Sequence, residues 1–129
     1  MTFKFSATSV KRMDGVNARL VDVAELALEL SPIDFGIPEL GGLRSADQQL
    51  LLFFNGKSQL DGTKKRSNHQ SGNALDVFAY VDGKASWDEN HLTTVAAAML
   101  EAASRLDVRV AWGGHWKNFK DMPHFEVIG

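Results

Sequence analysis

The chain has 129 residues, of which 44% are hydrophobic, and a formal net charge of −2. A chain of this length buries roughly two thirds of the surface that it exposes when unfolded, so one ordinary domain can form without covalent cross-links. The absence of cysteine excludes disulfides and thiolate metal sites, and it leaves His, Asp and Glu as metal ligands. The near balance of 14 basic and 16 acidic side chains argues against a nucleic acid partner.

The sequence also bears on where the protein works. Its first residues lack the apolar run of about 7–15 residues that a secretory signal requires. No stretch approaches the roughly 20 apolar residues of a membrane span. We therefore expect a protein made in the cytoplasm without stable membrane association. Because no internal repeat, low-complexity tract or linker-like shift in composition occurs, a single domain over residues 1–129 is predicted.

The first half of the chain predicts two helices separated by a short strand. Apolar residues recur every three or four positions over residues 16–30, as on one face of a helix. Ser31-Pro32 ends that helix, because proline disfavours helical geometry in the residue before it. Alternating apolar residues over 33–37 predict a short strand, and the proline that follows indicates either a sheet edge or the end of the strand. Residues 45–54 predict a second helix with a serine N-cap, and the Asn-Gly pair that follows ends it.

A polar loop and a central strand come next. Residues 57–68 are polar and contain an Asp-Gly pair, so we expect them in an exposed loop. Residues 74–81 are apolar and favour β structure, which predicts one central strand. Asp76 and Phe78 would share one face of that strand, and the apolar residues between them would take the other.

The last third predicts a long helix and two short strands. Ser86 and Glu89 have the spacing of a capping box, and an apolar stripe continues from there to residue 106. Residues 108–112 and 125–128 predict the remaining strands. Because the strands and helices do not alternate regularly, we expect an α+β fold with a small, mainly antiparallel sheet and flanking helices.

Asp76 is the residue of the predicted central strand that most needs a partner. A buried carboxylate is costly by several kcal/mol unless a metal or a cation pairs it, whereas an Asp facing solvent needs none. His69 lies seven residues earlier, and Gly72 between them would let the loop fold tightly onto the strand. The two side chains could then meet at one point.

His124 supplies a second imidazole at the start of the last predicted strand. Two imidazoles and one carboxylate can hold zinc by three protein groups and leave a position open for water. Asp121 lies three residues upstream, where a turn could direct its carboxylate at that water as a general base. This set of residues predicts a zinc hydrolase.

The motif Ser67-x-His69-x6-Asp76, followed by Asp121-x-x-His124, resembles the SxHxxGxAxD and (E/D)xxH signatures of a family of zinc peptidases. That family includes D-alanyl-D-alanine carboxypeptidases, vancomycin-resistance dipeptidases and phage L-alanyl-D-glutamate endopeptidases. Residues 42–48 also resemble its G-x-R-(S/T)-x-x-Q segment, and Trp-Gly-Gly precedes the last ligand as it does there. The resemblance covers most of the chain from about residue 34 onward, and it implies a fold similar to hedgehog and D-Ala-D-Ala peptidases.

By position, the resemblance makes His69, Asp76 and His124 the ligands of one Zn²⁺ ion and Asp121 the general base. Arg44 takes the place of the arginine that stabilises the oxyanion of the tetrahedral intermediate. The alternative for Arg44 is an ordinary surface arginine ahead of a helix.

Further residues are expected around the ligands. Ser67 and Gln48 would contact the substrate or support the ligands. His115 stands where an acidic residue often follows the glycine pair, so it is a substrate contact, an alternative ligand or, as we favour, a surface variant. His91 is expected on the exposed face of the long helix. The basic residues 64–66 either form a solvated loop or border the cleft and attract carboxylates of a peptide stem.

The leading hypothesis is a zinc-dependent peptidoglycan endopeptidase of the phage endolysin type, which cuts the stem peptide between L-alanine and D-glutamate. Asp rather than Glu in the base position favours the phage type. Such an enzyme would reach the cell wall through a separate membrane-permeabilising partner. The alternatives are a D,D-carboxypeptidase that removes terminal D-alanine and a non-catalytic zinc-containing domain that binds the wall or has a structural role. We expect a monomer, because no sustained apolar stripe is left over after the core is assigned.

Overall fold

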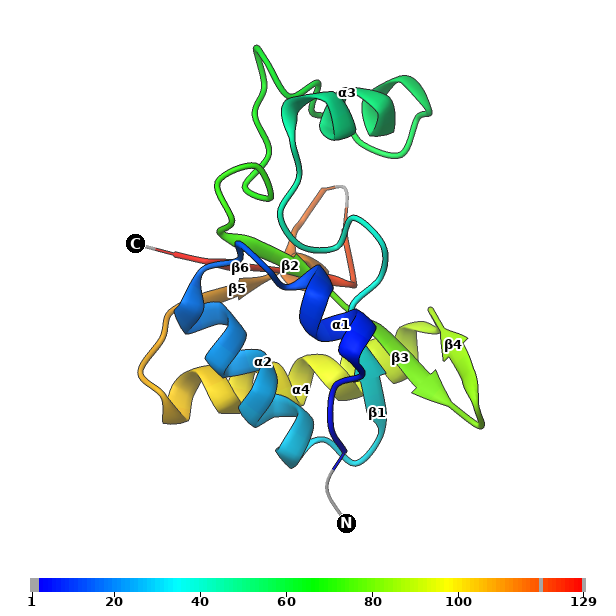
Figure 1. The fold of residues 1–129 in the computed structure, drawn as a ribbon. Coiled ribbons are helices and arrows are strands. Elements are labelled where there is room, and N and C mark those ends of the chain that lie inside the picture. The colour runs from blue at the N-terminus through cyan, green and yellow to red at the C-terminus, as the bar shows by residue number, and fades with distance from the viewer. Residues whose placement is uncertain (1–2, 119, 129) are drawn as a thin grey trace.

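The computed structural model describes residues 3–118 and 120–128 of the chain (Figure 1). Its elements, in chain order, are α1 (Ala7–Arg12), α2 (Ala18–Leu30), β1 (Asp34–Gly36), α3 (Ala46–Phe54), β2 (Ala74–Asp76), β3 (Phe78–Val81), β4 (Lys84–Ser86), α4 (Glu89–Arg105), β5 (Val110–Trp112), a 3₁₀ turn η1 (Gly113–His115) and β6 (His124–Val127). In the part of the chain so described, no helix has both the length and the apolar character needed to cross a membrane.

The strands form two small antiparallel sheets, with the orders β1-β3-β4 and β2-β6-β5. The predicted strand over residues 74–81 is therefore wrong in one respect, because it is split at Val77 between the two sheets. Asp76 pairs with His124 of β6, whereas Phe78 pairs with Gly36 of β1. The predicted alternation of faces is confirmed, since Val77 is fully buried and both Asp76 and Phe78 are partly exposed.

Helices α2 and α4 lie side by side and pack against each other beneath the β2-β6-β5 sheet (Figure 1). Their buried positions recur every three or four residues, as the apolar stripes predicted. In α2 these are Leu20, Val23, Ala24, Ala27 and Leu28, and in α4 they are Leu92, Val95, Ala96, Ala98, Met99, Ala102 and Ala103. Each fully buried Leu, Val or Met contributes about 1.5–3 kcal/mol. The core thus forms a firm support for the sheet that carries Asp76 and His124.

The start of α4 differs from the prediction. Its N-cap is Asp88, whose side chain accepts a hydrogen bond from the backbone N–H of Asn90 at 2.9 Å. Ser86 belongs to β4 instead, and its hydroxyl lies 2.7 Å from Nδ1 of His91. His91 is consequently half-buried rather than exposed. The prediction that Ser86 caps the helix is wrong, because Asp88 lies next to the first helical residue and is an equally favourable N-cap.

Residues 46–66, called the α3 lobe here, extend away from the two sheets and from α2 and α4 (Figure 1). The predicted serine cap is confirmed: Ser45 and Gln48 form a complete capping box. The rest of the lobe is the predicted loop, and the fully buried Gln49 ties it to the helix. Its amide nitrogen donates to the Ser58 hydroxyl at 2.9 Å and to the Leu60 carbonyl at 2.8 Å.

Candidate metal centre

Three side chains bring potential metal ligands to one point, as the sequence predicted. Nε2 of His69, Nδ1 of His124 and Oδ1 of Asp76 form a triangle with sides of 3.2, 3.2 and 3.3 Å. A tetrahedral zinc ion with bonds of about 2.0 Å separates its ligand atoms by about 3.3 Å. The triangle and its donor set of two nitrogens and one oxygen therefore fit a zinc-like divalent ion.

The β2-β6 pairing explains how Asp76 meets His124. The two residues are directly opposite each other in the antiparallel ladder. Opposed side chains in such a pair project from the same face with Cβ atoms about 4.5–5.5 Å apart. Two residues 48 positions apart in the chain are thus brought into contact by strand register, and their closest polar atoms are 3.2 Å apart.

A tight turn delivers His69. Gly72 has a φ of +77°, a left-handed conformation that favours glycine. A Cβ at this position would lie 2.5 Å from the Gly15 carbonyl oxygen, so a larger residue would push the turn away from its neighbour. The role expected for Gly72, which is to fold the loop onto the strand, agrees with this geometry.

The second nitrogen of each imidazole has its own partner. Nδ1 of His69 lies 2.9 Å from the Gly42 carbonyl, which can only accept, so Nδ1 carries the proton and Nε2 is free to bind a metal. Nε2 of His124 lies 2.7 Å from a carboxylate oxygen of Glu126, so the same reasoning leaves Nδ1 free. The other oxygen of Glu126 accepts a hydrogen bond from the Asn68 side chain at 3.0 Å.

The contact of Glu126 with His124 and with Asn68 was not predicted from the sequence. Glu126 follows His124 by two positions on the same strand, so the two side chains share one face. That spacing was a usable signal for Glu126. Nothing local in the sequence indicates that Asn68 meets it, because the two residues are 58 positions apart.

Arg44 is engaged with the metal centre rather than free on the surface. Its guanidinium donates to Oδ2 of Asp76 at 3.1 Å, to the Gln49 side chain at 3.1 Å and to the Leu40 carbonyl at 2.7 Å. The Arg44 side chain is only 12% exposed. It thereby holds one carboxylate oxygen of Asp76 and leaves the other facing the two imidazoles.

The charges of the centre shift the pKa values of its members. Burial alone would raise the pKa of Asp76, but the His124 and His69 imidazoles beside the carboxylate outweigh burial and lower it, so the carboxylate stays ionised. Burial likewise opposes the charged form of His124, yet Asp76 and Glu126 raise its pKa overall. For Asp121, burial and the neighbouring Asp76 charge both raise the pKa.

Asp121 lies beside the triangle, with a carboxylate oxygen 4.0 Å from Nδ1 of His124. Its side chain is 47% exposed, so water reaches it. The close approach of Gly113 fixes the local backbone, because a Cβ there would lie 2.2 Å from the Asp121 carbonyl oxygen. The Trp-Gly-Gly segment noted in the sequence therefore helps to place Asp121 at the centre.

A cavity of about 720 Å³ opens above the metal centre, a volume typical of sites for small ligands. The α3 lobe supplies one wall, and the segment between η1 and β6 supplies another. Lining residues from the lobe are Leu52, Lys57, Ser58, Gln59, Leu60 and Arg66, and those from the second wall are Trp116, Asn118, Lys120 and Asp121. The cavity thus has room for part of a peptide next to the triangle.

The remaining predicted residues fall in different places. Ser67 is buried at the cavity, and its hydroxyl accepts from the backbone N–H of His69 at 3.2 Å. Gln48 is exposed outside the cavity, where its side chain accepts from the Ser45 backbone and caps α3. The contact with Arg44 comes from its buried neighbour Gln49. His115 is exposed, packs edge-on against the Trp112 ring, and is not among the residues that line the cavity.

The chain is similar over nearly its whole length to known peptidases. Residues 1–127 match the family described as phage L-alanyl-D-glutamate peptidase. The L-alanyl-D-glutamate peptidase of Escherichia phage T5 is 36% identical over 128 residues, which cover 98% of this chain and 90% of that protein. The crystal structure of the Serratia marcescens L-Ala D-Glu endopeptidase ChiX matches with a TM-score of 0.86 and 38% identity, over 98% of this chain and 91% of that one. The predicted α+β fold is confirmed by this likeness.

Proposed function

The chain belongs to the phage L-alanyl-D-glutamate peptidase family, whose members are peptidoglycan-hydrolysing metallopeptidases, and we propose that it cleaves the stem peptide between L-alanine and D-glutamate. One Zn²⁺ would be held by His69, Asp76 and His124. The observation that carries this proposal is the triangle of ligand atoms, whose sides of 3.2–3.3 Å suit tetrahedral zinc. We propose zinc rather than another divalent ion because two imidazole nitrogens and one carboxylate oxygen are a donor set common in catalytic zinc sites.

When bound, zinc would act as a Lewis acid and lower the pKa of water to about 7. Asp121 is the group that moves the proton. Its carboxylate takes a proton from the attacking water, whose oxygen bonds to the alanyl carbonyl carbon. As the carbon–nitrogen bond breaks, the same proton passes to the departing glutamate nitrogen. A raised pKa suits Asp121 to hold the proton between these two steps.

Arg44 and Ser67 support this chemistry. Arg44 fixes the Asp76 carboxylate, and its guanidinium has five N–H donors, of which three make the hydrogen bonds described above. The others can face the oxyanion that forms on the alanyl oxygen, where positive charge stabilises the transition state by a few kcal/mol. Ser67 holds the backbone of His69 in place.

Mass spectrometry of digested peptidoglycan tests the proposed bond. We expect products in which D-glutamate becomes a new N-terminus. Loss of one D-alanine from otherwise intact stems would instead establish the D,D-carboxypeptidase alternative. A protein that binds zinc and the wall without releasing any product would establish the non-catalytic alternative.

Zinc itself is tested by metal analysis. We expect one zinc per chain, loss of zinc and activity with a chelator, and recovery of both when zinc is returned. The variant His69→Ala serves as a control, because it removes one of three ligands and should not recover. Full activity of the chelated protein would contradict the metal assignment.

We further propose that the protein acts as a phage endolysin, as a single-domain monomer that reaches the wall through a membrane-permeabilising partner. The family description, which names phage peptidases, supports this role. Expression in bacteria with and without a pore-forming protein tests it. Lysis is expected only with the pore, and lysis without it would refute the need for a partner. Sedimentation of the purified protein tests the monomer.

A further inference from the structure

Three cations in the cavity walls have no part in the proposed chemistry. Lys57 and Arg66 lie on the α3 lobe, and Lys120 lies on the wall that carries Asp121. All three side chains are exposed. Within residues 3–118 and 120–128, none of them has a carboxylate partner within 4.0 Å, unlike Arg44, which is paired with Asp76. These three cations are available to a ligand.

The charge around the cavity favours an anionic ligand. Its walls and floor carry the cations Arg44, Lys57, Arg66 and Lys120 against the carboxylates Asp76, Asp121 and Glu126. Asp76 is already engaged by Arg44 and Glu126 by His124. A divalent ion in the triangle would add further positive charge. A concave site in which the available charges are positive raises the local concentration of anionic ligands.

The wall that carries Lys57 and Arg66 is held in position by hydrogen bonds. Gln49 accepts from Arg44 and donates to Ser58 and Leu60, which connects this wall to the metal centre through Asp76. At the other end of the loop, the Gln70 side chain donates to the Gly62 carbonyl at 2.9 Å. The backbone of Lys57 donates to the Leu52 carbonyl at 2.8 Å. The cations therefore project from a loop whose path is fixed relative to the ligands.

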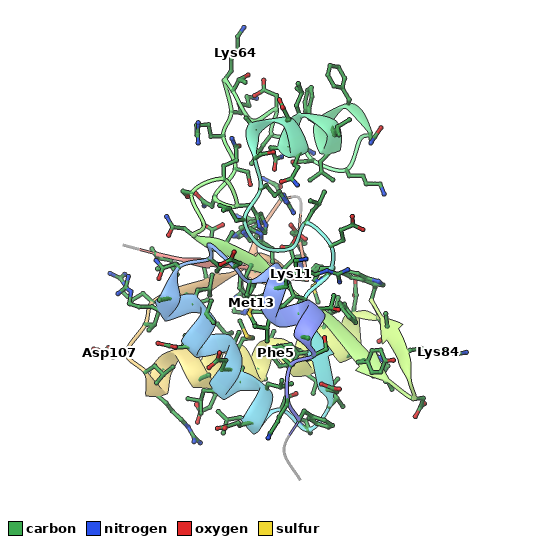
Figure 2. The ribbon with its side chains drawn as sticks, in the orientation of Figure 1. Phe5, Lys11, Met13, Lys64, Lys84 and Asp107 are labelled. Carbon is green, nitrogen blue, oxygen red and sulfur yellow. The ribbon has the colours of Figure 1, made fainter. Side chains whose placement is uncertain are left out.

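The three basic residues 64–66 lie in different places relative to the cavity. Only Arg66 lines the cavity, whereas Lys64 and Lys65 do not. Lys64 lies at the tip of the α3 lobe, away from the rest of the molecule (Figure 2). The expectation that this run borders the cleft therefore narrows to Arg66, and its two neighbours become natural controls of equal charge.

We propose that Arg66, assisted by Lys57 and Lys120, binds the free carboxylate of the glutamate that follows the scissile bond. This inference rests on the proposed function. A glutamate joined to alanine through its nitrogen and to the next residue through one carboxyl group keeps its other carboxyl group ionised at neutral pH. A guanidinium can donate two parallel hydrogen bonds to one carboxylate, which a lysine ammonium cannot do. Arg66 therefore selects an acidic residue on the leaving side of the bond.

Two peptides test the assignment: an L-Ala–D-Glu stem peptide with the free glutamate carboxylate, and the same peptide with that group converted to a carboxamide. The measured quantity is the ratio of kcat/KM for the two. We expect the wild-type enzyme to prefer the carboxylate by about tenfold, as for one charged hydrogen bond in a partly exposed site. Arg66→Gln should lose most of this preference, and Lys57→Gln and Lys120→Gln should each lose part of it.

The variants Lys64→Gln and Lys65→Gln make the same charge change outside the cavity and should keep the wild-type ratio. Equal zinc content and circular dichroism spectra verify that the variants are folded. The inference is overturned if Arg66→Gln keeps the wild-type ratio, or if the wild-type enzyme shows no preference. If the wild-type enzyme cuts neither peptide between alanine and glutamate, the proposed function fails and this inference fails with it.

Discussion

Replacing Glu126 with alanine should weaken zinc binding, although Glu126 is not itself a proposed ligand. Its carboxylate lies 2.7 Å from Nε2 of His124, and only 6% of the surface of His124 is exposed. This bond fixes the tautomer that presents Nδ1 to the metal, and it orients the ring. A hydrogen bond to a charged group contributes about 1.5–3 kcal/mol, so zinc affinity should fall by about 10–100-fold in Glu126→Ala.

Graded variants separate the charge of Glu126 from its shape. Glu126→Gln keeps a hydrogen-bond acceptor without the charge, and neutral hydrogen bonds are roughly half as strong. We expect about a fivefold loss of zinc affinity for this variant, which corresponds to about 1 kcal/mol. Asn68→Ala removes only the 3.0 Å bond to the second oxygen of Glu126, so its loss should be smaller still.

Competition with a chromophoric zinc chelator measures these affinities at fixed pH. The order of affinities expected is wild type, Asn68→Ala, Glu126→Gln and Glu126→Ala, from tightest to weakest. If Glu126→Ala bound zinc as tightly as the wild type while the protein stayed folded, the reasoning that Glu126 positions the His124 ring would be refuted.

Three further predictions concern the base, the turn and pH. Asp121→Asn should keep zinc bound yet lower kcat by about 10²–10⁴-fold, because it removes proton transfer; wild-type turnover by a zinc-loaded variant would show that Asp121 is not the base. Gly72→Ala should lower the free energy of unfolding by at least about 1 kcal/mol, because alanine is strained at a φ of +77° and its Cβ would meet the Gly15 carbonyl; unchanged urea unfolding and zinc affinity would contradict the role given to this turn. In the zinc-free protein, the raised pKa of His124 contributes stability that is fully present below its unfolded pKa of about 6.5 and is lost as pH rises through its folded pKa. The lowered pKa of Asp76 contributes stability that is present above its unfolded pKa of about 3.9 and is lost as pH falls through its folded pKa. Stability of the zinc-free protein should therefore be greatest between about pH 4 and 6.5, and urea unfolding curves that showed a steady rise from pH 6.5 to 9 would contradict this assignment.

The parts of the fold that follow from local patterns were predictable. The stripes of α2 and α4 and the serine cap of α3 depend on residues a few positions apart, where periodicity and capping act. The proximity of His69 and Asp76 was also predictable, because Gly72 lets the loop between them fold onto the strand. The place of His124 beside them was implied by the resemblance to the zinc peptidase signatures. α1 and β4 were missed, since six and three residues respectively are too few to show a period.

Features that depend on contacts between distant parts of the chain could not be predicted from the sequence. The apolar run over residues 74–81 breaks at Val77 because its first part pairs with β6 and its second part pairs with β1. Both partner strands are distant in the sequence, so local patterns do not indicate the break. The choice between Gln48 and Gln49 depends on the rotation of α3, where one position turns a side chain by about 100°. Gln48 caps the helix, whereas Gln49 faces Arg44. Motif spacing alone could not distinguish the two glutamines.

Titration of zinc into the metal-free enzyme, with mass spectrometric counting of peptides that begin with D-glutamate, tests the central claim most directly. We predict that product formation rises in proportion to zinc and stops rising at one zinc per chain. Product formation that does not depend on zinc, or zinc-dependent release of D-alanine in place of these peptides, would contradict the account.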